Sequence, residues 1–363
     1  MLKNLMTIFS LIIIIIIAIL FYLKFEVKEQ KLDYILDQST RALEKNLKNE
    51  KMNALEIALV LSKNEALVNA LENDDEDLGY KILADIMESL KQNVHRTIRT
   101  QMITSDLDIF ARSWDDVYAG ISLAEYRTDL HYFKTHTTPR SSIEVGRRLG
   151  IKATVPIYKG EILLGFVEVL DFFDNITDYF RAQGMDLYVL LDEEYFNTAT
   201  LMRENLTIDN YIVANINYNT SHIKVLENID FKHLQANRIV SSENRYIFYE
   251  DMHDGAGKTI GSFVFVMPDR YLDYFRGTED DISFFINVTR RDLYAVQKRQ
   301  QLNHKYEKEN AAELLYLKDI IQKEDSDDFL EIAYKKLDKY SKDELIKIML
   351  ENRSVKKIDG KIK

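Results

Sequence analysis

Charged and aromatic residues that could bind a small polar ligand begin at position 112 of this 363-residue chain. Arg112 and Trp114 lie two positions apart, so their side chains share one face if a strand continues that far. An arginine that stacks on an indole can still offer a carboxylate two parallel hydrogen bonds. The alternative is a surface arginine beside a buried tryptophan. Asp115 and Tyr118 follow in the same stretch as weaker candidates for the same site.

A second group of charges falls in three predicted strands, which cover residues 143–147, 151–157 and 162–170. Glu144 and Arg148 have the spacing of one strand face, with Arg147 on the other, so they could hold a ligand or form a structural ion pair. Glu168 could meet an arginine across the sheet or bind the amine of a ligand. Charges near a sheet face cost free energy unless they are paired or bound to a ligand. We therefore expect the functional site of the protein to lie in these three strands.

Several classes of function are disfavoured by composition and spacing. The chain has no cysteine, which excludes disulfides and thiol chemistry, and its net charge of −11 argues against a nucleic-acid partner. His131 and His136 are five positions apart and do not share a helix face, so we expect no metal site. No Ser/His/Asp or paired-carboxylate arrangement stands out. We therefore expect neither enzyme activity nor a cofactor.

Residues 4–23 form an uncharged apolar run whose length suits a lipid bilayer. The run ends without the small-residue cleavage site of a signal peptide, which favours an uncleaved anchor. We therefore predict a single membrane span. A short N-terminus followed by a long C-terminal part suggests that the bulk lies outside the cytoplasm.

The elements that must position the candidate residues can be read from periodicity. Residues 24–62 contain no glycine or proline and show helical apolar spacing, which predicts a long amphipathic helix that packs on its own domain and on a second copy. Shorter helices are predicted at 67–71 and 78–99, and a strand at 102–110. Similar strands that contain Gly165 and Gly261, about 96 residues apart, indicate a duplicated module.

Three stretches carry a family resemblance, namely residues 54–64, 112–115, and 143–147 with the 155–157 and Gly165 strands that follow. Over roughly residues 24–270 the chain resembles the double Cache extracytoplasmic sensor domains of bacterial chemoreceptors, histidine kinases and diguanylate cyclases. The resemblance implies an α+β fold in which a long N-terminal helix carries two PAS-like antiparallel-sheet modules. It also implies homodimers through the long helix and small-molecule binding in the membrane-distal module. Together with the single anchor, it implies a place in the bacterial inner membrane, with the bulk of the chain in the periplasm.

The predicted domains are an anchor, a helical lead-in, a membrane-distal module, a membrane-proximal module and a helical C-terminal extension, at 1–23, 24–100, 101–185, 186–268 and 269–363. The expected function is that of a membrane-anchored sensor of a small ligand, such as a carboxylate or an amino-acid-like compound. Receptors of this family carry a second membrane helix after the last strand, and no second apolar run of that length follows residue 23. An alternative is therefore a single-pass binding or scaffold protein that acts on a separate signalling partner through its C-terminal helices.

Overall fold

The structure is a computed structural model that describes residues 2–94, 98–115, 119–124, 127–273, 314, 326–338, 340–343 and 345–346. Before residue 26 it describes side chains only at 12–17, 19 and 22. Most of the predicted anchor side chains therefore lie outside the described residues. Among the helices that are described with their side chains, none is long and apolar enough to cross a membrane.

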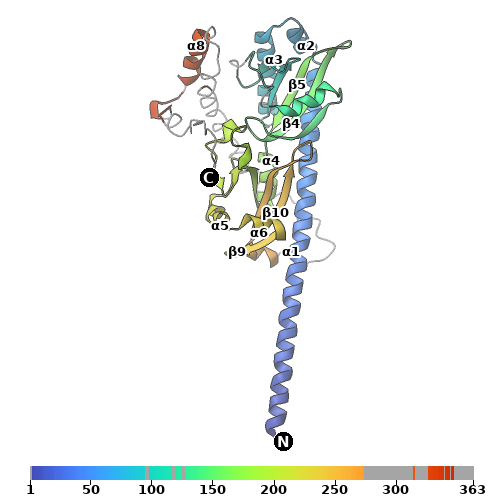
Figure 1. The fold of residues 1–363 in the computed structure, drawn as a ribbon, viewed down its shortest axis with the longest axis vertical. Helices are drawn as coiled ribbons and strands as arrows, with labels where there is room; N and C mark the ends of the chain where they lie inside the picture. The colour runs from blue at the N-terminus through green and yellow to red at the C-terminus, as the bar shows by residue number, and fades with distance from the viewer. Residues whose placement is uncertain are drawn as a thin grey trace.

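One helix, α1 (Leu2–Ser62), is the spine on which both sheets pack. The predicted helix at 24–62 is confirmed and continues toward the N-terminus, well past the sheets (Figure 1). Its buried residues recur at helical spacing. Ile35 and Leu43 pack in a core with the second sheet, and Ala54 and Ala58 pack in a core with the first.

The first sheet is antiparallel and has the strand order β2-β1-β5-β4-β3. Its strands are β1 (Arg99–Thr104), β2 (Ile109–Arg112), β3 (Arg140–Glu144), β4 (Gly150–Lys159) and β5 (Ile162–Asp171). The predicted three-stranded meander is confirmed as β3, β4 and β5, with Gly160 at φ +61° in the tight turn. One face packs on α1 and on the predicted short helices, which are α2 (Glu65–Glu72) and α3 (Glu76–Val94).

The second sheet repeats this order and adds one short strand, giving β7-β8-β6-β11-β10-β9. Its strands are β6 (Asp186–Asp192), β7 (Thr207–Ile208), β8 (Tyr211–Val213), β9 (Ile239–Ser242), β10 (Arg245–His253) and β11 (Thr259–Pro268). Gly165 in β5 and Gly261 in β11 occupy matching places, because a Cβ on either would overlap a carbonyl oxygen of the neighbouring strand. The predicted duplication of an antiparallel module is therefore confirmed.

Short helical elements join the strands. They are η1 (Thr128–Lys134), α4 (Asp174–Ala182), η2 (Glu193–Tyr195), η3 (Thr200–Met202), η4 (Thr220–His222), α5 (Ile223–Glu227), α6 (Phe231–Asn237) and η5 (Asp269–Asp273). In the C-terminal part the described helix is α8 (Ser326–Leu337), and most of the predicted extension at 269–363 lies outside the described residues. The Asp-Gly-Ala-Gly turn at 254–257 joins β10 to β11 as a hairpin.

The prediction of one strand over 102–110 is wrong, because the chain reverses inside that range. Leu107 adopts φ +71°, and its N–H donates to the Thr104 carbonyl at 3.1 Å, which closes a turn between β1 and β2. The turn contains no glycine or proline, so the strongest turn signal is missing. Its sign in the sequence is the polar run Thr104-Ser105-Asp106, which the predicted strand passes through. The helix predicted to reach 99 ends at Val94, since Arg99 already belongs to β1.

Candidate functional site

The first sheet turns a polar face away from α1. Because side chains alternate along a strand, the residues between those that pack on α1 must point to the opposite side. Cross-strand pairing places them in two rows. One row runs Arg112, Gln101, Glu168, Thr154, and the next runs Arg99, Leu170, Lys152.

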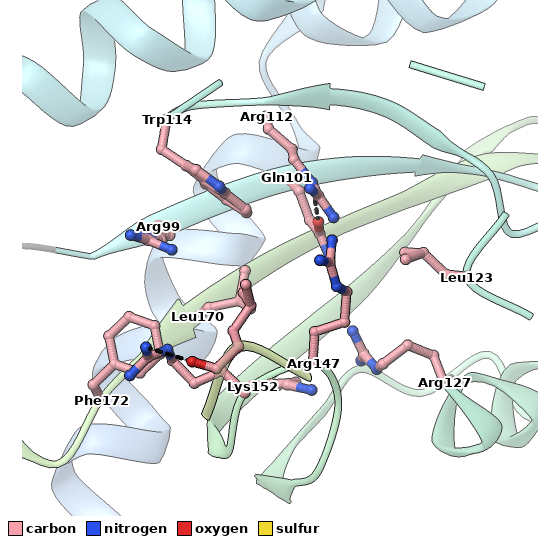
Figure 2. Close-up of a pocket in the computed structure, with 12 residues that line it drawn as sticks. Arg99, Gln101, Arg112, Trp114, Leu123, Arg127, Arg147, Lys152, Leu170 and Phe172 are labelled. Atoms are coloured by element: carbon pink, nitrogen blue, oxygen red, sulfur yellow. Dashed lines mark hydrogen bonds between the residues drawn. The ribbon is translucent and has the colours of Figure 1, made fainter. Parts of the chain in front are cut away.

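A cavity of about 60 Å³, partly open to solvent, lies over this face (Figure 2). Its lining consists of Arg99, Gln101, Arg112, Trp114, Leu123, Arg127, Arg147, Arg148, Lys152, Leu170, Phe172 and Leu201. Half of these residues are cationic, and none of them is a carboxylate. The sorting of charges in the lining favours a small anion.

A buried ion pair supports the floor of the cavity. Arg127 donates from Nη1 to Glu168 Oε1 at 2.6 Å and from Nε to Asp129 Oδ1 at 2.8 Å. Gln101 and Thr154 also donate to the Glu168 carboxylate, at 2.7 and 3.0 Å. Burial alone would raise the pKa of Glu168, but Arg127 outweighs it and lowers that pKa. Glu168 therefore meets an arginine, which was one of the two predicted alternatives, and lies beneath the lining.

Aromatic rings hold the arginines at one side of the cavity. The Arg112 and Arg99 guanidinium carbons lie 5.1 and 5.2 Å from the centroid of the Trp114 ring. The Arg148 guanidinium carbon lies 5.6 Å from the centroid of the Phe172 ring. The structure confirms that Arg112 lies over the indole ring of Trp114, as predicted. Such stacking orders a guanidinium and leaves its edge N–H groups able to donate.

Lys152 brings an ammonium group to the cavity from β4, although its side chain is almost completely buried. Burial and, to a smaller extent, the Arg127 charge lower its pKa to about 8. The carboxylates of Asp129, Glu168 and Glu144 oppose that shift. Although burial alone would raise the pKa of Asp129, Arg127 lowers it to about 2, so both carboxylates beside Arg127 are charged near neutral pH.

Glu144 does not line the cavity, and its predicted strand-face partnership with Arg148 is wrong. Its carboxylate accepts hydrogen bonds from Ser142 Oγ at 2.6 Å, Arg140 Nη2 at 3.2 Å and the Gly255 N–H of the second module at 3.3 Å. The strand β3 ends at Glu144, and the chain then bends. Because of that bend, the adjacent Arg147 and Arg148 both line the cavity, contrary to the alternation expected of a strand.

The candidate residues thus separate into two groups. Arg112, Trp114 and Arg148 line the cavity, whereas Glu144 and Glu168 do not. Asp115 is buried beside them and forms an isolated bridge with Arg112, and Tyr118 lies outside the described residues.

Sequence reasoning missed Arg99, Gln101, Arg127, Arg147 and Lys152. Polar residues at alternate positions of β1 and β4 were the available signal, and nothing marked Arg127, which lies in a loop. Among the described residues, no group of three or more histidines, aspartates or glutamates is placed to hold a metal ion.

Comparison with known proteins identifies a family that this chain matches. The dCache family, described as "Double sensory domain of two-component sensor kinase", matches residues 29–272. Similar solved structures include the periplasmic domain of Vibrio cholerae LuxQ, at 13% identity and TM-score 0.40, covering 64% of this chain and 99% of that one. The V. cholerae histidine kinase DctB sensor domain is 12% identical with TM-score 0.38, covering 65% and 98%.

A third similar structure is the ligand-binding domain of the Pseudomonas fluorescens chemoreceptor CtaA in complex with L-leucine. It is 11% identical with TM-score 0.38, covering 68% of this chain and 97% of that one. No curated protein matches the chain.

Proposed function

This chain belongs to the double Cache family of sensory domains, and from that premise we propose that it senses a small anionic ligand in the cavity of its first module. Sensor domains of this family bind ligands and transduce signals. The observation that carries the proposal is the lining of the cavity, where six cations lie beside five apolar or aromatic residues.

The residues then take distinct roles. Arg112, Trp114 and Arg148 contact the ligand. Glu168 and Asp115, which lie behind the lining, hold the cations in place by charge and backbone pairing. Glu144 acts at the contact between the modules and does not touch the ligand. Buried partners of this kind order binding groups before the ligand arrives, which lowers the entropic cost of binding.

The membrane arrangement is also part of the proposal. Residues 1–23 anchor the chain in the inner membrane, the module at 101–185 is membrane-distal and the module at 186–268 is membrane-proximal, both outside the cytoplasm. The apolar sequence of this segment supports an anchor, as does the exposure of Ile12 to Ile17, each between 41 and 62% exposed. Removal of residues 1–23 should move the chain from the membrane fraction to the soluble fraction. Retention of the shortened chain in membranes would contradict the anchor.

The experiment that tests the sensor uses the single tryptophan of the chain, Trp114. A library of small anions is screened by melting temperature and by tryptophan emission. A ligand at a hundred times its Kd should add about 2.7 kcal/mol, which is roughly 5–10 °C for a chain of this size.

Arg112→Ala should abolish both responses, whereas Arg41→Ala, a change on the exposed side of α1, should leave them unchanged. A ligand that stabilises the protein without altering emission, and equally in Arg112→Ala, would place the site elsewhere.

A further inference from the structure

Lys152 carries the unusual feature of this cavity. Its side chain is only 4% exposed, and no hydrogen bond or ion pair joins its ammonium to another residue that the structure describes. An ammonium group has three donors, and Lys152 brings them to the cavity that its side chain lines. The nearby carboxylates of Asp129 and Glu168 are already bound by Arg127. The partner that Lys152 lacks in the protein is therefore expected in the cavity.

The loop above Lys152 is shaped to leave room for that ammonium. A Cβ at Gly146 would lie 2.5 Å from the Lys152 Nζ atom. Gly146 does not adopt a positive φ, so its backbone conformation does not require glycine. The missing side chain instead keeps space for the end of the lysine.

The cavity has cationic groups at two ends. In Figure 2, Trp114 and Arg112 lie at one side, Lys152 lies at the other, and Leu170 and Arg147 lie between. A charged group at each end of a short carbon skeleton would match this arrangement. An ammonium on the ligand would meet a lining without a carboxylate, because Glu168 and Asp129 lie behind it and are bound by Arg127.

We propose that the cavity selects a small organic dianion, one anionic group of which is bound by Lys152 and the other by Arg112, and that it rejects α-amino acids. The proposal rests on the proposed function, since it assumes that this cavity is the ligand site. It deepens that function by naming the class of ligand and by assigning Lys152 as the residue that determines specificity.

The test measures binding to the full chain by titration calorimetry. The probes are malonate, succinate and glutarate, compared with succinamate, inorganic phosphate and L-leucine. At least one dianion should bind, and Lys152→Met should raise its Kd by about 30-fold or more, as expected when one partner of a buried charge pair is removed. The matched control, Lys159→Met, changes an exposed lysine of the same strand and should leave the Kd unchanged.

Two further measurements distinguish a direct contact between Lys152 and the ligand from a purely structural role of Lys152. Replacing one carboxylate of succinate by the amide in succinamate should cost much less affinity in Lys152→Met than in the wild type, because the contact is already lost. The melting temperature of ligand-free Lys152→Met should not fall, because a buried charge without a direct partner is removed. A lower melting temperature with unchanged dianion affinity would overturn the assignment of Lys152.

The remaining outcomes distinguish this inference from the proposed function. Binding of L-leucine that depends on Arg112, without dianion binding, would overturn the dianion class and leave the sensor intact. Binding of phosphate alone would overturn an organic ligand. If no probe binds, the dianion class is wrong, whereas the proposed function is decided separately by the wider library and the response of Trp114.

Discussion

Lys152 has a second measurable consequence, in the pH dependence of stability. Its pKa falls from 10.5 in the unfolded chain to about 8 in the folded one. Between these values the unfolded chain binds more protons, so the free energy of unfolding rises with pH. The destabilising charge is fully present below pH 8 and is relieved as the lysine loses its proton.

We expect the difference in stability between wild type and Lys152→Met to change by about 2 kcal/mol from pH 7.5 to 9.5, in favour of the wild type. Urea unfolding of both proteins at the two pH values measures this difference. The groups that act on Lys152 are Arg127, Asp129, Glu168 and Glu144, and all four are present in both proteins. Parallel pH profiles would show that Lys152 keeps its proton throughout this range.

Arg127 and Glu168 differ from Lys152, because their two charges are buried and paired with each other. Arg127→Met leaves the Glu168 carboxylate buried without its cation, which should destabilise the protein by about 3–5 kcal/mol at neutral pH. Burial, together with the Asp129 charge, should then outweigh the remaining charge of Lys152 and raise the pKa of Glu168 above its unfolded value. The loss should therefore shrink as pH falls and Glu168 takes up a proton.

The matched control for this pair is the double variant Arg127→Met/Glu168→Gln, which removes both charges and should recover much of the stability. Thermal unfolding between pH 4.5 and 7.5 checks both variants. A single variant whose deficit is constant with pH would mean that Glu168 gains another cation.

At the scale of elements, the sequence identified those whose signals are local. The β4–β5 hairpin has alternating residues and a glycine at positive φ, and both features were readable. The bend after Glu144 and the turn around Leu107 have weaker signals, namely Gly146, which is not at positive φ, and the short polar run before Leu107, so strands were extended through them.

The candidate site was only partly predictable from the sequence. The alternation of apolar and polar residues indicates which face of a sheet a side chain lies on, but it does not indicate which strand pairs with its own. Gln101 contacts Glu168, 67 positions away, because β1 pairs with β5. Arg127 reaches Glu168 from a loop, where no periodicity applies. Arg112 and Trp114 could be found because their relation is local, whereas Lys152 became distinctive only when burial separated it from the exposed lysines.

Two glycine substitutions should have opposite effects, which tests how the sheet and the cavity are built. A Cβ at Gly165 would overlap the Ile103 carbonyl oxygen, so β5 and β1 would have to separate. Gly165→Ala should cost about 2 kcal/mol or more in unfolding free energy. Gly146→Ala meets the mobile end of Lys152 and should cost little stability, but it should weaken dianion binding.

Chemical denaturation and calorimetry on both variants check this crossed pattern. Equal losses of stability would mean that the β1–β5 spacing is not as close as described. Unchanged binding in Gly146→Ala would mean that Lys152 can move aside without losing its contact.

At the scale of the whole molecule, the cavity touches both modules. Leu201, from the second module, is part of the lining, and its N–H donates to the Arg147 carbonyl at 2.9 Å. Arg147 Nε donates to Thr200 Oγ1 at 3.1 Å, and the Leu149 N–H donates to Met202 Sδ at 3.2 Å. A ligand that holds the loop at 146–149 therefore also holds η3.

We expect ligand binding to slow hydrogen exchange at the amide of Leu201, because its partner Arg147 becomes more strongly ordered. Exchange measured by mass spectrometry with and without ligand checks this. The exposed turn at 254–257 serves as an internal reference because it does not line the cavity. Protection confined to the first module would show that the ligand is sensed without this contact.

We propose that the spine helix also pairs with that of a second copy of the chain. Exposed apolar residues of α1 include Val27, Tyr34, Met52 and Leu59. At 3.6 residues per turn these four positions fall within roughly 40° of one another. The buried positions that pack on the sheets, such as Ile35 and Ala54, lie on the other side of the helix. One helix thus presents one face to its own modules and has a separate apolar face that fits the packing of a partner helix.

We therefore expect Met52→Glu to weaken dimers of the chain, because it places a charge in the middle of that apolar face. Glu44→Lys alters the charge of an exposed position away from the face and should leave the dimer intact. Sedimentation equilibrium in detergent measures both dissociation constants, and we expect a rise of at least tenfold for Met52→Glu alone. Met52 contacts neither the cavity nor the core. The melting temperature of the Met52→Glu variant at high dilution should therefore match that of the wild type. A wild-type chain that remains monomeric at high concentration would rule out α1 as a dimer contact, and would require the ligand signal to pass along a single copy.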